Sequence, residues 1–209
     1  MSLPKPKSAR ASAAPIDTRE HFEARDRAAW RAWLAERHAT SPGVWVVTYK
    51  KSSGRPTLTY DELVEEALCF GWVDSRPGTV DALRTKLYVA PRKRGSGWAA
   101  TNKVRIARLL PAGLMAPAGL AALEAAKADG SWTLLDTSEA AVAPDDLRAA
   151  FARHAGAGAN FDAFPLGVRK AILQWIALAK TDATRAKRVE ETASLAAKNV
   201  RANQWRPKA

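Results

Sequence analysis

The side chains that are best suited to binding or catalysis lie between residues 72 and 102. Those that could form one binding cleft are Trp72, Asp74, Arg92, Lys93, Ser96, Trp98 and Asn102. The basic run 92–94 is followed by Gly95-Ser96-Gly97, and the next residues favour a helix. A glycine-flanked loop that enters a helix exposes backbone N–H groups, and the helix dipole favours an anion there. We therefore expect this segment to bind an anionic group.

Each of these residue types has a role in such a cleft. Trp72 and Trp98 would form aromatic walls, while Ser96 and Asn102 would donate hydrogen bonds. Asp74 would orient a basic side chain or act as a general base. The alternative is that both indoles belong to the core, Asp74 caps a turn and the basic loop is solvated. The Gly-Ser-Gly triplet matches neither a Walker A loop nor a dinucleotide fingerprint.

Other signatures of catalysis are missing from the sequence. His21, His38 and His154 are widely spaced, and none has a carboxylate or cysteine at ligand spacing. No Gly-x-Ser-x-Gly motif occurs. The single cysteine, Cys69, lies in an apolar stretch and is expected to be a buried, inert thiol. We predict no metal site, no cofactor and no catalytic residue, and an enzyme would have to depend on Asp74.

The charge of the chain is concentrated in two segments. The 209 residues include 33 Lys+Arg and 21 Asp+Glu, for a net charge of +12. Residues 84–108 carry eight basic and no acidic side chains, and residues 166–209 carry ten basic and three acidic ones. Together they suggest nucleic-acid binding as an alternative function. The carboxy-terminal basic face could instead meet anionic lipid or the chain's own acidic middle segment, and Lys50, Lys51 and Arg55 could extend the basic rim.

The elements that must position these residues follow from periodicity and capping. Apolar spacing predicts a helix over about 20–38, and a β-branched run predicts a strand over 44–49. Thr59 and Glu62 form a capping box for a helix that ends near Phe70, with Gly71 as its stop. Two strands are predicted over 72–76 and 86–91, with a turn at 78–81. A helix follows over 101–110.

Beyond Pro111 the pattern is helical only. Helices are predicted over 117–128, after Pro144 to about 153, over 168–179 and over 183–200, with a flexible break at 156–158. The fold class is therefore α+β, with a small mixed or antiparallel sheet and helices in the amino-terminal half and an all-helical carboxy-terminal half. The predicted organisation is a disordered basic tail over 1–15, an α+β region with the cleft over 16–110 and a helical region over 111–209.

Three separated motifs resemble one protein family. The stretch 175–189 resembles "WI..AK..ETR..RI", residues 67–74 are similar to "ALCFGWID", and residues 91–98 with Asn102 are similar to "PRR..S.WS..N". These patterns are typical of the YdeI/OmpD-associated (bacteriocin-protection) family, and the resemblance extends from about residue 30 to 203. The chain departs from it at Ala183, Val189 and Ala99, where the family has an acidic residue, Ile and Ser.

The resemblance implies a largely uncharacterised bacterial protein, and the family name implies protection against antibacterial peptides and association with an outer-membrane porin. Because residues 1–15 contain no apolar signal run, and no window approaches ~18 apolar residues, we expect a cytoplasmic protein without a transmembrane segment. The leading prediction is a non-enzymatic binder of an anionic small molecule or an acidic protein surface. Nucleic-acid binding, Asp74-dependent catalysis and a stress-tolerance interaction remain alternatives, and the sequence does not fix the oligomeric state.

Overall fold

The computed structural model describes residues 15–204 of the chain. The predicted basic tail lies outside these residues, apart from Pro15. Two compact units are present: one comprises the chain up to Ala67 together with Trp72–Pro91, and the other comprises Leu68–Gly71 and the chain from Arg92 onward. The predicted boundary between residues 110 and 111 stays a prediction.

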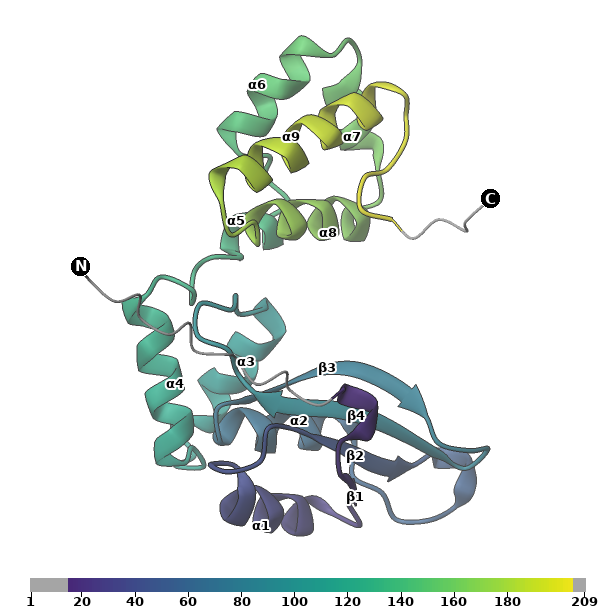
Figure 1. The fold of residues 1–209 in the computed structure, drawn as a ribbon, viewed down its shortest axis with the longest axis vertical. Helices are drawn as coiled ribbons and strands as arrows, with labels where there is room; N and C mark the ends of the chain where they lie inside the picture. Colours follow the sequence, from purple (N-terminus) through teal and green to yellow (C-terminus); the bar gives the residue numbers. More distant parts are fainter. Residues whose placement is uncertain (1–14, 205–209) are drawn as a thin grey trace, which may run out of the picture. The chain divides into compact units, whose positions relative to one another are not determined.

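The first unit is built on a four-stranded mixed sheet with the order β1-β2-β4-β3 (Figure 1). Its strands are β1 (His21–Glu23), β2 (Val44–Tyr49), β3 (Trp72–Thr79) and β4 (Arg84–Pro91). β1 pairs parallel with β2, whereas β4 pairs antiparallel with both β2 and β3. The predicted small mixed sheet is thereby confirmed.

The first helix begins later than its apolar spacing predicts. Helix α1 spans Arg27–Arg37, because the Asp26 side chain accepts a hydrogen bond from the Ala29 N–H at 2.8 Å and caps the helix there. The three residues of β1 precede it, so the predicted start at residue 20 is wrong. The Phe22 side chain, which fits the helical spacing, packs instead from β1 against Trp33, with 5.8 Å between ring centroids.

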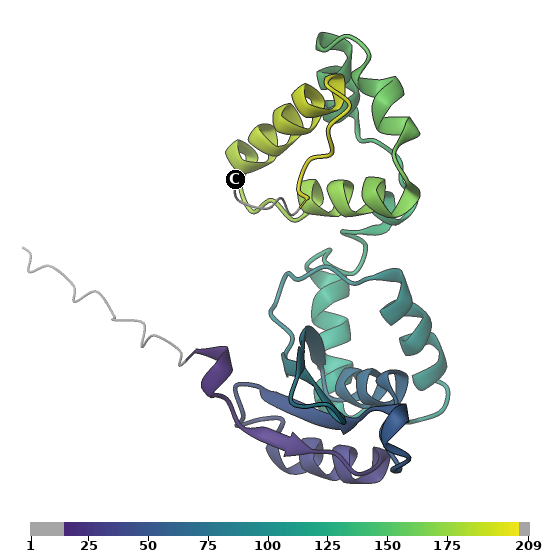
Figure 2. The ribbon, with the colours of Figure 1, turned by 90° about the vertical axis from the view of Figure 1, so that its right-hand side faces the viewer.

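Helix α1 lies along one face of the sheet (Figure 1 and Figure 2). Trp33 meets the Trp72 ring edge-on at 5.8 Å between centroids, which joins α1 to β3. The helix also contacts α2 (Tyr60–Cys69), where the Trp30 indole donates to the Leu63 carbonyl oxygen at 3.0 Å. Arg27 and Arg31 both reach the buried Glu66 carboxylate at 2.6 Å. These contacts fix the helix pair on the sheet.

The capping box at the start of α2 is confirmed. The Glu62 carboxylate accepts hydrogen bonds from the Thr59 N–H and hydroxyl, and the Thr59 hydroxyl oxygen accepts from the Glu62 N–H. Gly71 ends the helix with a φ of +74°, a conformation that glycine adopts without strain. Two short 3-10 turns, η1 (Ile16–Thr18) and η2 (Lys51–Ser53), complete the first unit.

The second unit is helical throughout its described residues. Its helices are α3 (Ala100–Leu109), α4 (Pro117–Ala128), α5 (Asp136–Glu139), α6 (Asp145–Arg153), α7 (Ala157–Ala163), α8 (Leu166–Ala177) and α9 (Asp182–Ala197). The predicted all-helical carboxy-terminal half, and with it the α+β class, is confirmed. The break falls at residues 154–156, slightly before the predicted 156–158, because α6 ends at Arg153 and α7 already starts at Ala157. Gly156 within it has a φ of +75°.

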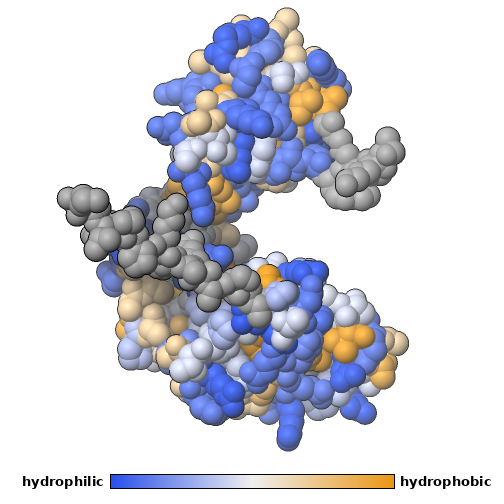
Figure 3. All heavy atoms as spheres, viewed as in Figure 1, coloured by the Kyte–Doolittle hydropathy of each residue, from blue (hydrophilic) through white to orange (hydrophobic). Residues whose placement is uncertain are grey.

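The carboxy-terminal helices share one apolar core, with the green-to-yellow helices of Figure 2 around it. Its buried members from α6 to α9 include Leu147, Phe161, Ile172, Ile176 and Val189. On the face drawn in Figure 3, hydrophilic side chains predominate in both units. Within residues 15–204, no helix has the length and apolar character needed to span a bilayer.

Candidate functional site

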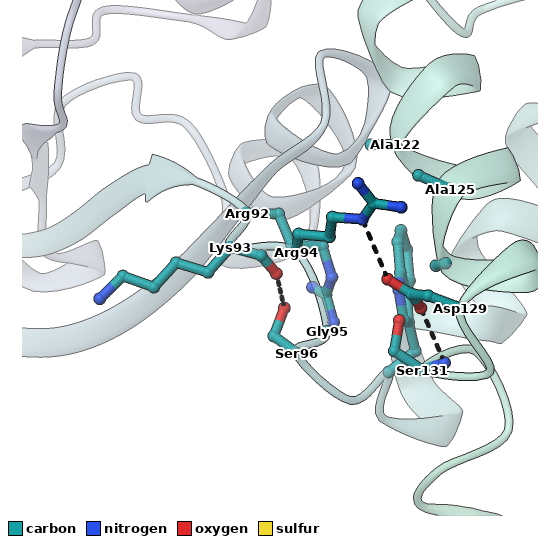
Figure 4. A pocket seen from close by; sticks show the side chains of 11 residues that line it. Arg92, Lys93, Arg94, Gly95, Ser96, Ala122, Ala125, Asp129 and Ser131 are labelled. Carbon is teal, nitrogen blue, oxygen red and sulfur yellow. Dashed lines mark hydrogen bonds and ion pairs between the residues drawn. The ribbon is translucent and has the colours of Figure 1, made fainter. Parts of the chain in front are cut away.

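A cavity of about 260 Å³ in the second unit brings together four of the predicted site residues, Arg92, Lys93, Ser96 and Trp98. The segment after β4 forms one side of the cavity, and α4 with the turn that follows it forms the other (Figure 4). The residues on that second side are Ala122, Ala125, Ala126, Asp129 and Ser131. Because the α4 residues are alanines, their side chains leave space for a ligand beside the basic loop.

Arg92 is anchored by Trp98. Its Cζ atom lies 3.8 Å from the centroid of the Trp98 ring, and Nη2 donates to the Gly97 carbonyl oxygen at 2.5 Å. The Trp98 side chain is 1% exposed, and its indole Nε1 has no hydrogen-bond partner among the described residues. A guanidinium held over the face of an indole is a preorganised cation. The site therefore contains one fixed positive group, beside an indole whose buried N–H has no partner among the described residues.

Asp129 provides the negative charge of the cavity. The hydroxyl and N–H of Ser131, the nearby Arg94 charge and the Gly95 N–H hold the pKa of this carboxyl below its usual value, so it is ionised at neutral pH. Arg94 Nε lies 3.7 Å from Asp129 Oδ2, and the Arg94 side chain is 82% exposed. Figure 4 shows Arg94 extending toward Asp129, whereas Lys93 points away from it.

The charges around the cavity do not cancel, because three basic residues and one acidic residue line it. Ser96 acts within the loop: its hydroxyl donates to the Lys93 carbonyl oxygen at 2.6 Å. Gly97 is required by close packing, since a Cβ there would lie 2.7 Å from Leu135 Cγ. The loop is thus shaped by its own hydrogen bonds and presents a net positive charge to the cavity.

Three predicted site residues do not line this cavity. Trp72 belongs to the first unit, where it is 1% exposed and its indole donates to the His38 carbonyl oxygen at 3.2 Å. Asp74, also in the first unit, accepts a hydrogen bond from the Tyr60 hydroxyl at 3.0 Å. Asn102 is buried in α3 and accepts one from Arg105 Nη1 at 3.1 Å. Their known contacts are with the protein itself.

The far side of the cavity is not evident from the sequence. Asp129 and Ser131 follow the end of α4. The local sequence around them shows only that a helix ends there. Their approach to the loop depends on the packing of α4, which no local spacing reveals. The described residues contain no group of three or more His, Cys, Asp or Glu side chains that could hold a metal ion.

Two family models match the chain. Residues 140–199 match the family described as "Bacteriocin-protection, YdeI or OmpD-Associated", which confirms the predicted resemblance for this segment. Residues 22–122, which contain both amino-terminal motifs and the basic loop, match a "Domain of unknown function (DUF8412)". No curated protein and no solved structure gives a significant match to the chain.

Proposed function

We propose that this protein binds an anionic group and catalyses no reaction. The starting point is the match of residues 140–199 to the bacteriocin-protection, YdeI or OmpD-associated family. The ligand is a small anionic molecule or an acidic part of a partner. The observation that carries the proposal is the loop 92–94, whose three consecutive cations line a cavity with a single carboxylate. Such a field attracts anions and raises their local concentration.

The size of the cavity narrows the ligand class. At about 260 Å³ it is smaller than the roughly 300–1,000 Å³ of pockets that enclose a drug-sized ligand. It fits one phosphate or carboxylate group better than a whole large molecule. Arg92 would hold that group, the unused Trp98 N–H is a further donor, and Arg94 could exchange its loose contact with Asp129 for the ligand.

Calorimetric titration of the full chain with inorganic pyrophosphate tests the proposal. We expect saturable binding that weakens as salt is raised, because the attraction is electrostatic. Arg94→Gln should weaken binding several-fold with little effect on folding, since the side chain is exposed. Lys187→Gln removes the same charge from an exposed position on α9 and is the matched control. Equal binding by both variants and the parent chain would refute the site.

Nucleic-acid binding is the second candidate, and the contacts of the two basic segments weigh against it. Arg84 pairs with Asp81 and Glu23, Lys103 pairs with Asp136, and Arg185 pairs with Asp146. These carboxylates offset part of the charge that phosphates would need. Salt-dependent retention on single- or double-stranded DNA that survives Arg94→Gln would favour this candidate over the small anion site.

The proposal extends to the biological setting that the family name suggests. We propose that the protein acts in the cytoplasm and contributes to tolerance of stress or of antibacterial peptides. A strain that lacks the gene should then be more sensitive to cationic peptides than its parent. Unchanged sensitivity would count against the tolerance role but not against the anion site, which the pyrophosphate titration tests separately.

A further inference from the structure

We propose that the first unit contains a second, separate binding site, which takes a small uncharged molecule with an apolar body and one polar group. A cavity of about 490 Å³ lies where β2, β3 and β4 face the start of α2 and the segment before it. This volume falls within the roughly 300–1,000 Å³ that encloses a drug-sized ligand. All of its lining residues belong to the first unit, so the site does not depend on the second one.

The walls of this cavity are predominantly apolar. Leu58 and Leu63 are buried in the core and contribute to the wall from the α2 side. Leu87 of β4 and Pro77 of β3, which are paired across the two strands, contribute from the sheet. Leucine, proline and the methyl groups of threonine cannot solvate a charge. The body of the ligand must therefore be apolar.

One hydroxyl inside the cavity is left for a ligand. Thr48 of β2 is 9% exposed, and its hydroxyl makes no hydrogen bond with any residue from 15 to 204. Its neighbours are engaged, because Thr85 donates to the Gly78 carbonyl oxygen at 2.8 Å and Thr57 accepts from the Tyr49 N–H at 3.0 Å. This hydroxyl is not among the fully buried polar atoms that lack a partner, so it is accessible and can make a hydrogen bond in the cavity. We assign that bond to the polar group of the ligand.

The charged residues of this site do not favour a charged ligand. Lys51 and Asp61, which both line the cavity, carry opposite charges. Lys86 also contributes to the lining, but its ammonium group lies 4.3 Å from the centroid of the Trp45 ring and 3.0 Å from His21 Nε2. The site therefore differs in chemistry from the cavity beside Arg92.

Tyr60 gives this site an aromatic element. Its side chain lines the cavity and is 57% exposed, and its hydroxyl donates to Asp74 Oδ2 at 3.0 Å. Asp74 thus positions the ring without lining the cavity. A ring held in this way can contact a planar ligand as it enters.

Fluorescence titration of the full chain with N-phenyl-1-naphthylamine tests the inference, because this probe is uncharged and apolar and carries one N–H group. We expect saturable 1:1 enhancement. Thr48→Val keeps the side-chain shape and removes the hydroxyl, and should weaken binding by about 2- to 10-fold, as for one lost hydrogen bond. Thr137→Val, at an exposed position in α5, is the matched control.

A second variant blocks the cavity. Leu87→Trp should abolish probe binding, and circular dichroism checks that the variant is folded. If it does not fold, the comparison of Thr48→Val with Thr137→Val decides. Pyrophosphate should not displace the probe, and Arg94→Gln should leave its affinity unchanged, so the two sites can fail independently. Parent-like affinity in Thr48→Val, or no saturable enhancement with the parent chain, would overturn the inference.

Discussion

The guanidinium carbon of Arg92 lies 3.8 Å from the ring centroid of Trp98, and both residues line the same cavity. The contact joins the first cation of the basic loop to an indole that is almost completely buried. Arg92 is therefore fixed by the core, while Lys93 and Arg94 are exposed. A fixed cation loses less conformational freedom when it binds an anion than a mobile one does.

Arg92→Lys should separate charge from geometry. Lysine keeps the positive charge but loses the flat stacking on Trp98 and the hydrogen-bonding fork. We expect pyrophosphate affinity to fall about tenfold and the free energy of unfolding to fall by about 1 kcal/mol. Titration and urea denaturation measure the two effects. Arg55→Lys is the control, since Arg55 stacks on Tyr49 outside this cavity, at 4.9 Å from the ring centroid.

Asp129→Asn should strengthen anion binding. The variant keeps an oxygen that can accept from the Ser131 N–H, now at 3.0 Å, but removes the carboxylate charge from the cavity. We expect pyrophosphate affinity to rise by about 3- to 10-fold at low salt, the scale of one repulsive charge at short range in a polar setting. The gain should shrink at high salt. Unchanged or weaker affinity at low salt would argue that the anion does not enter this cavity.

Gly119→Ala should destabilise the second unit strongly. A Cβ at Gly119 would lie 2.2 Å from the Cys69 carbonyl oxygen, and backbone atoms cannot move aside as a flexible side chain can. We expect a loss of about 3 kcal/mol in the free energy of unfolding. Gly158→Ala is the matched control, because its nearest neighbour is Phe151 at 3.8 Å. Alanine in that helix should be neutral or stabilise by up to ~1 kcal/mol, and urea denaturation compares the two.

Glu62 should contribute to the acid sensitivity of the first unit. Hydrogen bonds from the Thr59 N–H and hydroxyl lower the pKa of this carboxyl from its ordinary 4.5. A lowered folded pKa means that the stabilisation is complete above pH 4.5 and is lost as the pH falls through the lower folded value. The parent chain should exceed Glu62→Gln in melting temperature at pH 7, and the gap should close on acidification.

A second variant checks the cause of that pH dependence. In Thr59→Ala the hydroxyl donor is gone, so the Glu62 pKa should rise toward its ordinary value when it is followed by carboxyl NMR. The variant should also lose about 1 kcal/mol of stability through the missing cap. An unchanged Glu62 pKa would mean that the hydroxyl bond does not control this carboxyl.

Local signals predicted much of the fold. The Thr59–Glu62 box located the start of α2, and Pro144 preceded the start of α6 as expected. The prediction missed β1 with three residues, α5 with four and α7 with seven. The first two are too short to show a period, and α7 begins inside the glycine-containing stretch 156–158 that suggested a break. β3 continues past its predicted end at Arg76 because Pro77 and Gly78 pair with β4 at a sheet edge, where proline is tolerated.

The candidate site was predictable only along one stretch of chain. Arg92, Lys93, Ser96 and Trp98 are close in sequence, so a basic, glycine-rich pattern could group them. Trp72 was grouped with them because tryptophan is frequent both in cores and in clefts, and its burial against Trp33 could not be read from spacing. The Asp129 side of the cavity arises from tertiary packing alone.

NMR of the Arg92 and Trp98 side-chain N–H groups shows whether an anion binds beside these two residues. Inorganic pyrophosphate is added while the Arg92 Nε–H and Trp98 Nε1–H resonances are followed. We expect both resonances to shift together and to saturate with one dissociation constant, and we expect Arg94→Gln to raise that constant several-fold. Shifts confined to other basic residues, with these two resonances unmoved at saturation, would contradict it.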